Sequence, residues 1–325
     1  MGIVIKSFDV GKGDFFLIKV SDSAGKYFNL MVDCGKKNVS KELKVALNGQ
    51  RLNGIVITHV DNDHIIGVID LVEKYECCKF MKDVFIIYNK YDETLITYDK
   101  GNKLYEEIKR RLSQKMLLKS YARNYSRENK AIECRRKKDE LPVHILSKIQ
   151  RALMSVDMMR KDNVYITLLS PNVDKLKKFM RDWKKVNESA VKIQEDRKLI
   201  NQSSITFLLE FNGKRVLMLG DGFVSDVFEA LKDIKGVETI DYVKLAHHGA
   251  GCNNKGIEKF YKKYSCEKYG VTIEVNQDKR TSHPNRDIIN ILVSQGCHIY
   301  TSTNFQCTDP TDCVHMIEKQ SEIFL

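Results

Sequence analysis

No run of apolar residues in this 325-residue chain approaches the length of about 18 that a membrane-spanning helix requires. The first residues, Met1 to Lys6, lack the charged and apolar regions of a signal peptide and look instead like the start of a strand. The nine cysteines contain no C-x-x-C pair and follow no regular spacing, so we interpret them as reduced thiols. Together these absences predict a cytoplasmic protein with no membrane segment.

Glycine is absent from residues 102–200, and the excess of positive charge falls in nearly the same region. Residues 96–200 contain 27 Lys and Arg against 14 Asp and Glu, whereas the rest of the chain contains 27 against 29. The formal net charge of +11 therefore comes from one strongly basic segment attached to a nearly neutral body. Such an asymmetry indicates an anionic partner for that segment.

Short β-rich runs lie on both sides of the basic segment. In the first 95 residues, apolar runs separated by Gly and Asp predict strands at 3–5, 15–20, 27–32, 55–57 and 84–88. In the second half, the Asn212-Gly213 pair between two apolar runs predicts a hairpin. The strands expected there are 204–211, 215–219, 242–246 and 271–275.

The basic segment itself has a helical pattern. Leu104, Ile108, Leu112 and Met116 recur every four positions and predict an amphipathic helix, and a similar pattern predicts a second helix over 173–186. We therefore expect three regions: 1–95 as the first half of the body, 96–200 as a mostly helical insertion, and 201–325 as the second half. One core strand near 164–170 is expected to break the insertion once.

The most informative stretch of the sequence is Thr58-His59-Val60-Asp61-Asn62-Asp63-His64, directly after the apolar run 54–57. A helix-like apolar pattern begins at Ile65. Two imidazoles and two carboxylates on so short a loop converge on one point only when they bind a cation there. Without a cation, clustered carboxylates repel one another and stay in solvent. The alternative is a polar turn with Asp61 or Asp63 as a helix cap, which leaves both histidines unexplained. We interpret the stretch as a metal site.

Further Asp and His residues follow predicted strands of the second half: Asp221 after 215–219, His247 and His248 after 242–246, and His283 after 271–275. Ligands gathered at the ends of adjacent strands are a common way to build a metal cleft in a sheet protein. We assign His247 to the metal site and His248 and His283 to catalysis, one of them protonating a leaving oxygen. The sequence does not say which of the paired imidazoles is the ligand. For His283, a surface turn before Pro284 is the alternative.

In order along the chain, these motifs resemble the metallo-β-lactamase superfamily, most closely the hydrolase domain of the ComEC DNA-uptake proteins and their free-standing relatives. The matching segments are Asp9-Val10-Gly11-Lys12-Gly13-Asp14 (D-x-G-Q-G-D in the family), Val32-Asp33-Cys34-Gly35 (I-D-T-G), residues 59–64 (H-x-H-x-D-H), Asn201 with Ser204 (N-x-x-S), Gly220-Asp221, His247-His248-Gly249-Ala250 (H-H-G-S) and His283-Pro284. The likeness covers about residues 1–95 and 201–303 and leaves the insertion outside.

The resemblance implies an α/β fold, a four-layer αββα sandwich with two divalent metal ions at one edge of its sheets. In that scheme His59 and Asp61 would bind the first ion, Asp63 and His64 the second, and Asp221 would bridge them. His247 or His248 would complete the site.

One departure from the family pattern bears on the choice of metal. The family's second histidine is Asp61 here, and a carboxylate at that position favours manganese or magnesium, with zinc as an alternative. A weakened or lost first site is the other interpretation that the sequence leaves open.

Several residues of the matched motifs are expected to support the ligands without binding metal themselves; these are Asp9, Asp14, Asp33, Asn201 and Ser204. A carboxylate beside a ligand imidazole fixes the orientation of the ring. Because Asp9 and Asp14 flank glycines, plain turn chemistry is the alternative for both.

The basic segment has tyrosines among its charges, a combination that suits a sequence-independent clamp on a nucleic-acid backbone. A solvated charged face is the alternative. The residues assigned to nucleic-acid binding are Lys109, Arg110, Arg111, Arg123, Arg127, Arg135, Arg136, Lys137 and Lys138.

These observations predict a metal-dependent phosphodiesterase, a nuclease acting on DNA. The alternatives are a hydrolase of small phosphodiesters such as cyclic nucleotides and a nucleic-acid-binding subunit with weakened catalysis. The sequence also leaves open a protein partner or a homo-oligomer.

Overall fold

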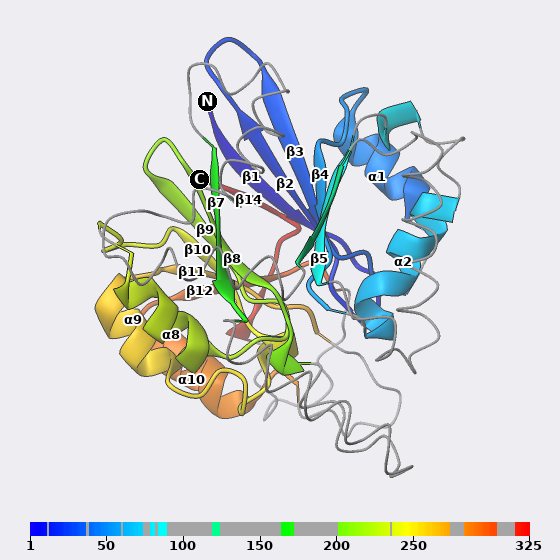
Figure 1. Ribbon diagram of the computed structural model, residues 1–325. Coiled ribbons are helices and arrows are strands. Elements are labelled where there is room, and N and C mark those ends of the chain that lie inside the picture. The colour runs from blue at the N-terminus through cyan, green and yellow to red at the C-terminus, as the bar shows by residue number, and fades with distance from the viewer. Residues whose placement is uncertain are drawn as a thin grey trace, which may run out of the picture.

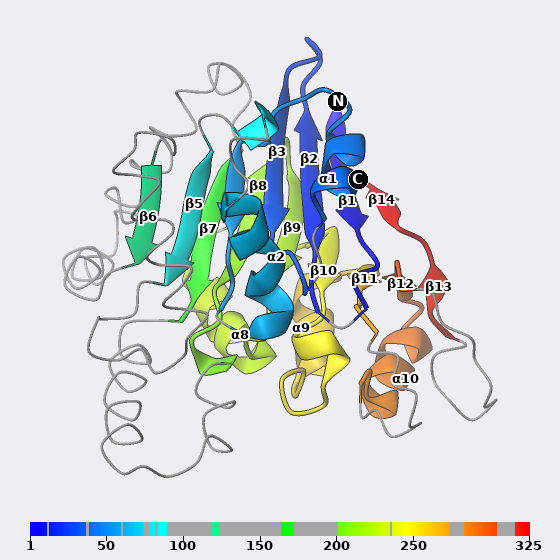
Figure 2. The same cartoon turned by 90° about the vertical axis from the view of Figure 1, so that its right-hand side faces the viewer.

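The structure is a computed structural model, and it has four layers. Two seven-stranded mixed sheets pack face to face, and helices cover the outer face of each sheet (Figures 1 and 2). The residues that it describes are 1–11, 13–36, 39–59, 61–73, 79–81, 84–89, 119–123, 164–171, 201–234, 236–273, 283–303 and 316–325.

The first sheet has the strand order β14-β1-β2-β3-β4-β5-β6. Its strands are β1 (Gly2–Ser7), β2 (Phe16–Ser21), β3 (Tyr27–Val32), β4 (Gly54–Val56), β5 (Phe85–Asn89), β6 (Lys119–Arg123) and β14 (Glu322–Phe324). Pairing is antiparallel from β14 through β3 and parallel from β3 through β6. The last strand of the chain thus closes the first sheet beside β1.

The second sheet repeats this arrangement in the order β13-β12-β11-β10-β9-β8-β7. Its strands are β7 (Tyr165–Ser170), β8 (Thr206–Phe211), β9 (Lys214–Met218), β10 (Tyr242–Lys244), β11 (Lys268–Gly270), β12 (His298–Thr301) and β13 (Glu318–Lys319). β7, β8 and β9 pair antiparallel, and β9 through β13 pair parallel. Because parallel neighbours all end at the same edge, this order brings the loops after β9, β10 and β11 together.

Three apolar cores hold the layers together. The helices α1 (Ser40–Leu47) and α2 (Asn62–Glu73), with the short turn η2 (Lys79–Met81), cover the outer face of the first sheet. A second core lies between the two sheets. The third lies between the second sheet and the helices α8 (Val224–Lys232), α9 (Ile257–Tyr264) and α10 (Arg286–Ser294).

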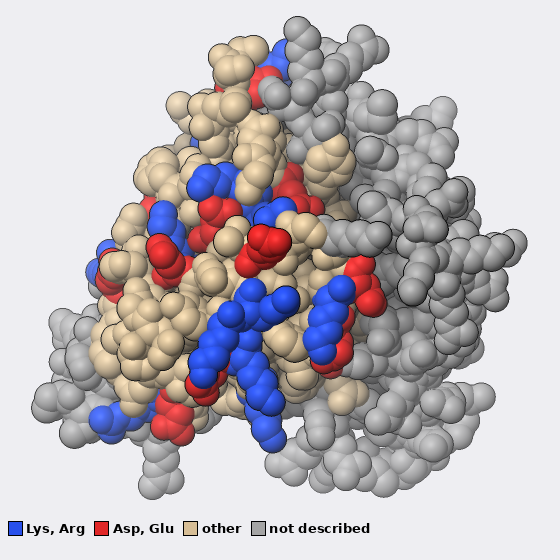
Figure 3. Space-filling model, turned by 90° about the vertical axis from the view of Figure 1, so that its left-hand side faces the viewer, with Lys and Arg blue, Asp and Glu red and all other residues tan. Residues whose placement is uncertain are grey.

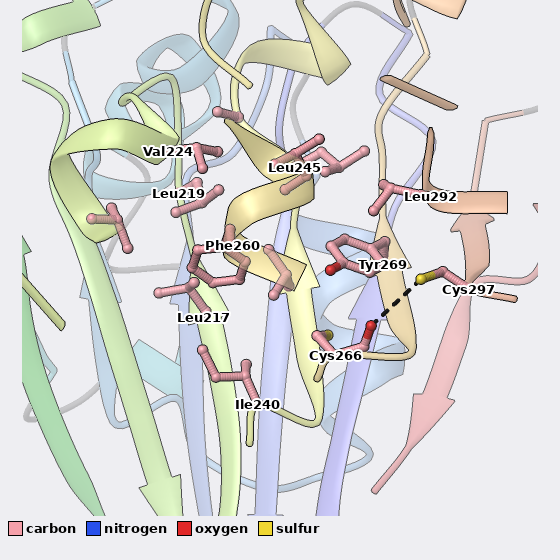
Figure 4. Packing of buried hydrophobic residues seen from close by; sticks show 14 of the residues in the cluster. Leu217, Leu219, Val224, Ile240, Leu245, Phe260, Cys266, Tyr269, Leu292 and Cys297 are labelled. Atoms are coloured by element: carbon pink, nitrogen blue, oxygen red, sulfur yellow. Dashed lines mark hydrogen bonds between the residues drawn. The ribbon is translucent and has the colours of Figure 1, made fainter. Parts of the chain in front are cut away.

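The core under α9 shows why this helix forms where it does. Ile257, Phe260 and Tyr264 recur at spacings of three and four residues, so they share one face of the helix and are all buried. Phe260 packs close to Leu217 of β9 and to Leu219 directly after this strand (Figure 4). The opposite face of α9 is exposed and rich in lysine. On this side of the molecule Lys and Arg are interspersed with Asp and Glu (Figure 3).

The predicted four-layer fold is confirmed, and the predicted strands of the first half coincide with β1 to β5 within two residues. The hairpin expected at Asn212-Gly213 joins β8 to β9, with both residues in the left-handed region (φ 49° and 75°). The strand predicted at 271–275 lies earlier in the chain, as β11 (Lys268–Gly270). The residues that pair with β12 are 268–270, so the strand ends at Gly270.

The described residues of the region 96–200 form two strands, and the sequence predicted one of them. β7 is the core strand expected near 164–170, whereas β6 was not predicted and pairs parallel with β5 at the edge of the first sheet. Its sequence, Lys-Ser-Tyr-Ala-Arg, lacks the apolar run that marked the other strands. The helices predicted around 104–116 and over 173–186 lie outside the described residues.

Four cysteines fall in the described part of the chain, and all four are free: Cys34, Cys252, Cys266 and Cys297. Among the helices that the structure describes, none combines the length and apolarity needed to cross a membrane.

Candidate metal centre

The predicted ligands meet at the edge where the parallel strands of both sheets end. His59 follows β4, Asp221 follows β9, and His247 and His248 form the short turn η5 (His247–Gly249) after β10. Asp63 lies in the first turn of α2, where the unpaired backbone N–H groups and the helix dipole favour a carboxylate. Side chains separated by more than 150 residues in sequence therefore line one pocket.

Asp221 lies at the centre of the site because each of its carboxylate oxygens faces a different group of residues. Its Oδ2 lies 3.6 Å from Nε2 of His59 and 3.6 Å from Nε2 of His247. Its Oδ1 lies 3.4 Å from Nε2 of His64. A carboxylate used in this way can bridge two cations about 3.5–4 Å apart.

The first group of ligands consists of His59, Asp61 and His247, together with Oδ2 of Asp221. Oδ2 of Asp61 lies 3.7 Å from Nε2 of His59. Atoms at such separations, too long for hydrogen bonds, suit ligands that each bind a common ion at about 2 Å.

The second group consists of Asp63, His64 and His248, together with Oδ1 of Asp221. Ligand atoms of Asp63, His64 and His248 all lie within 4.8 Å of one another, as do those of His59, His64 and Asp221. Nε2 of His248 is 3.8 Å from Oδ2 of Asp63. Both histidines of the 247–248 pair therefore lie among the candidate ligands, whereas the sequence assigned one to metal and the other to proton transfer.

Unpaired polar atoms test whether a metal fits here. Within the described part of the chain, Nε2 of His59, His64 and His248 and Oδ1 of Asp221 are buried and have no hydrogen-bond partner. Leaving such an atom unpaired costs roughly 1–3 kcal/mol. All four atoms are the usual ligand atoms of their side chains and point into the same pocket, so the residues present fit divalent cations.

The electrostatics of the pocket also favour positive charge. Burial would raise the pKa of Asp221, but the neighbouring histidines, His64 first, hold it well below its ordinary value. Burial likewise opposes ionisation of Asp63, yet the contact with His248 and the charge of His64 keep its pKa far below normal. The pKa of His64 is raised well above its ordinary value because Asp221 and Asp33 outweigh desolvation. The carboxylates thus stay ionised and attract a cation.

Each ligand imidazole is held through its Nδ1 atom. Nδ1 of His64 lies 2.7 Å from Oδ2 of Asp33, and Nδ1 of His59 lies 2.9 Å from the hydroxyl of Thr58, which donates to Asp33. Asp33 also accepts the backbone N–H of Thr58. These bonds leave Nε2 of both rings free to face Asp221, and a carboxylate in this position fixes the orientation of an imidazole.

His248 is held by a longer chain of buried groups. Its Nδ1 lies 2.7 Å from the hydroxyl of Thr272, which donates to Oδ1 of Asp14 at 2.6 Å. Oδ2 of Asp14 pairs with the ammonium of Lys244, which also donates to the carbonyl of Gly220 at 3.2 Å. Burial would raise the pKa of Asp14, but Lys244 together with the nearby His248 and His64 lowers it and keeps the carboxyl ionised. Asp14 is therefore more than a turn residue.

His247 has neutral partners. Its Nδ1 lies 2.9 Å from the side-chain amide of Asn201 and 3.3 Å from that of Asn253. Ser204 accepts the backbone N–H of Asp221 at 3.0 Å, and Asn253 donates to the carbonyl of Asp221 at 2.7 Å. Asn201 and Ser204 thus contact the candidate ligands His247 and Asp221.

Asp9 and His283 were the two assignments with open alternatives. Asp9 is exposed and accepts the backbone N–H of Gly11, a contact typical of a turn. The ring of His283 lies 5.2 Å from the ring of His247, which places it at the rim of the site. Of the residues assigned to nucleic-acid binding, Arg123 lies in β6 and the other eight lie outside the described residues.

The sequence analysis missed four supporting residues: Thr58, Lys244, Asn253 and Thr272. Lys244 gave the clearest signal, because it interrupts the apolar run 242–246 directly before the paired histidines. A lysine that is fully buried needs a carboxylate partner, and Asp14 is that partner. The hydroxyl and amide residues gave no signal, since their roles depend on contacts between distant segments.

The backbone of the paired histidines is unusual. His247 and His248 both lie in the left-handed region, with φ of 45° and 53°. For residues other than glycine this conformation costs roughly 1–2 kcal/mol each. It turns both side chains toward the ligands, and such local strain is concentrated at functional sites.

Gly13 lets the loop after β1 approach the ligand Asp63. A Cβ atom at this position would lie 2.0 Å from the backbone oxygen of Asp63, and its φ is +119°. Gly25 is a matched control, because its φ is also positive (+74°) but nothing lies within 4 Å of an added Cβ. We expect Gly13→Ala to lower the free energy of unfolding by about 1–3 kcal/mol more than Gly25→Ala, as measured in urea. Equal losses would show that the close approach has no energetic consequence.

One comparison with known proteins, the family model, agrees with the fold. Residues 11–118 match the family model of the metallo-β-lactamase superfamily. No curated protein matches the chain significantly. Similar solved structures include a diphosphatase of the PhnP family (10% identity, 100% of this chain and 98% of that chain, TM-score 0.42). Another is Zn²⁺-bound PqqB from Methylobacterium extorquens (10% identity, 95% of this chain and 100% of that chain, TM-score 0.46). A third is the long form of RNase Z from yeast (12% identity, 96% of this chain and 39% of that chain, TM-score 0.38). At these identities and TM-scores, the likenesses support no inference about substrate.

Proposed function

The chain has the metallo-β-lactamase fold, and from this premise we propose that it is a metal-dependent phosphodiesterase, a nuclease acting on DNA. One observation supports the proposal above the others. Two groups of ligands, each with two imidazoles and one carboxylate, face the two oxygens of Asp221. This arrangement suits a pair of divalent ions and the displacement of an oxygen at phosphorus.

The residues of this chain would divide the work as follows. His59, Asp61 and His247 would hold one ion, Asp63, His64 and His248 the other, and Asp221 both. Bound divalent ions lower the pKa of water and offset the charge that develops on phosphate oxygens.

His283 is the proposed donor of a proton to the leaving oxygen. It is half-buried beside His247 and lies outside the two ligand groups. His248, to which the sequence gave this role, is instead proposed as a ligand because its Nε2 faces Asp63.

The donor set supports a proposal about metal identity. Each group offers two imidazole nitrogens and carboxylate oxygens, a mixture that manganese and zinc both accept. Asp61 in place of the family's histidine gives the first group the same donors as the second and makes it harder than in the family, which favours manganese or magnesium over zinc.

DNA as the substrate is proposed from the sequence of the basic insertion. Residues 96–200 hold 27 basic and 14 acidic residues, whereas the described face over α8, α9 and α10 mixes both signs (Figure 3). A polyanion would therefore be attracted to the insertion rather than to that face.

A hydrolysis assay on single- and double-stranded DNA, RNA and bis(p-nitrophenyl) phosphate tests the proposal across magnesium, manganese and zinc. We expect cleavage of DNA with manganese or magnesium, and loss of cleavage after chelation or in Asp63→Ala. Turnover of the small phosphodiester without affinity for DNA would select a small-molecule hydrolase instead. DNA binding without hydrolysis of any phosphodiester would contradict the proposed enzyme and select a binding subunit.

A further inference from the structure

The two ligand groups have the same donor set. Each combines two imidazoles with one aspartate, and Asp221 contributes one oxygen to each. Donor type therefore gives neither position an advantage for a given ion. Any difference in affinity between them must come from burial and from the groups that hold the ligands.

Burial differs between the groups. In the first group, the side chains of Asp61 and His247 are 23% and 29% exposed. In the second group, those of Asp63 and His248 are 13% and 3% exposed, and His64 is fully buried. Water and chelators therefore reach the first group more readily, and the second group holds its charge in a drier environment, where electrostatic attraction is stronger.

The anchoring of the imidazoles differs in the same direction. His59 and His248 are equivalent, because each contacts a threonine hydroxyl that donates to a buried aspartate. The contrast lies between the other two rings. His64 contacts the carboxylate of Asp33 directly at 2.7 Å, whereas His247 contacts the neutral amides of Asn201 and Asn253. A carboxylate partner makes an imidazole a stronger ligand than an amide partner does.

We propose that the two positions bind their ions with unequal affinity. The position formed by Asp63, His64 and His248 retains its ion, and the position formed by His59, Asp61 and His247 exchanges its ion with the solvent. The inference rests on the proposed metal-binding function and adds an order of filling. The difference expected from partners of this kind is about 10- to 100-fold in affinity.

Retention of manganese tests this order without reference to activity. The protein is stripped with a chelator, saturated with Mn²⁺, dialysed against metal-free buffer, and its bound manganese is counted by mass spectrometry. We expect two ions per chain at saturation and one after dialysis. Asp61→Asn should still retain one ion after dialysis, whereas Asp63→Asn should retain none. These two variants are matched, because each removes one charge from one group.

A second pair of variants separates anchoring from ligation. Thr272→Val removes the hydroxyl that holds His248, and Asn201→Ala removes an amide that contacts His247. We expect Thr272→Val to weaken the retained ion about tenfold or more and Asn201→Ala to leave its affinity unchanged. The reverse result in either pair of variants, or the loss of both ions together from the wild-type chain, would overturn this inference but not the proposed function. A wild-type chain that binds no ion at saturation would overturn the proposed function as well.

Discussion

Hydrolysis should fall at least about a thousandfold when Asp221 is replaced by asparagine, a loss of roughly 4 kcal/mol in transition-state stabilisation. Asp221 is buried, and each of its oxygens faces a different ligand group. An amide has the same shape but only one oxygen and no charge, so it could not serve both ligand groups at once. The measurement is kcat/KM on DNA with manganese or magnesium.

Asp233→Asn is the control for this substitution. Asp233 is exposed at the C-terminal end of α8, and loss of its charge should leave kcat/KM unchanged. Asp221→Asn must also unfold at nearly the wild-type denaturant concentration in the absence of metal, so that lost activity reports on the site. Activity in the Asp221→Asn chain equal to that of the wild type would mean that Asp221 bridges nothing in the reaction.

The second large effect is expected from the basic insertion. Neutralising Arg135, Arg136, Lys137 and Lys138 together should weaken binding to double-stranded DNA and reduce its dependence on salt. Each phosphate contact adds about 0.9 to the slope of log K against log salt concentration, so four lost contacts lower the slope by up to about 3.6. Titrations at several salt concentrations measure both quantities, and the count of bound metal ions should not change.

A matched variant on α9 distinguishes a specific clamp on DNA by the insertion from general electrostatic attraction of DNA to positive charge. Lys255, Lys259, Lys262 and Lys263 are exposed in or just before α9, a helix that also carries the exposed Glu258. Neutralising these four removes the same charge and should change the salt slope by much less. Equal weakening by both sets of substitutions would argue against a specific role for the insertion.

Much of the fold could be predicted because its signals are local. Tyr27–Val32 and Thr206–Phe211 are apolar and β-rich, and Asn212-Gly213 supplies the positive φ angles that a tight hairpin needs. β6 was missed because its charged and small residues give no strand pattern, and only pairing with β5 makes it a strand. Parallel pairing joins segments distant in sequence, so local pattern seldom reveals it.

In the candidate site, too, the residues with a local sequence signal could be predicted and those that depend on contacts between distant segments could not. His59, Asp61, Asp63 and His64 could be recognised because they lie within six consecutive positions after a strand. The support of His248 could not, since Thr272 and Asp14 belong to loops of different sheets and contact each other only in the folded chain. Sequence alone also could not show that both histidines of the pair face the ligands, which depends on two left-handed backbone angles.

Anomalous X-ray diffraction from crystals grown with Mn²⁺ would locate the ions directly. Two peaks are expected on either side of the Asp221 carboxylate, about 3.5–4 Å apart. One should lie among His59, Asp61 and His247 and the other among Asp63, His64 and His248. Crystals saturated with manganese that show no peak within reach of Asp221 would contradict a two-metal centre in this protein.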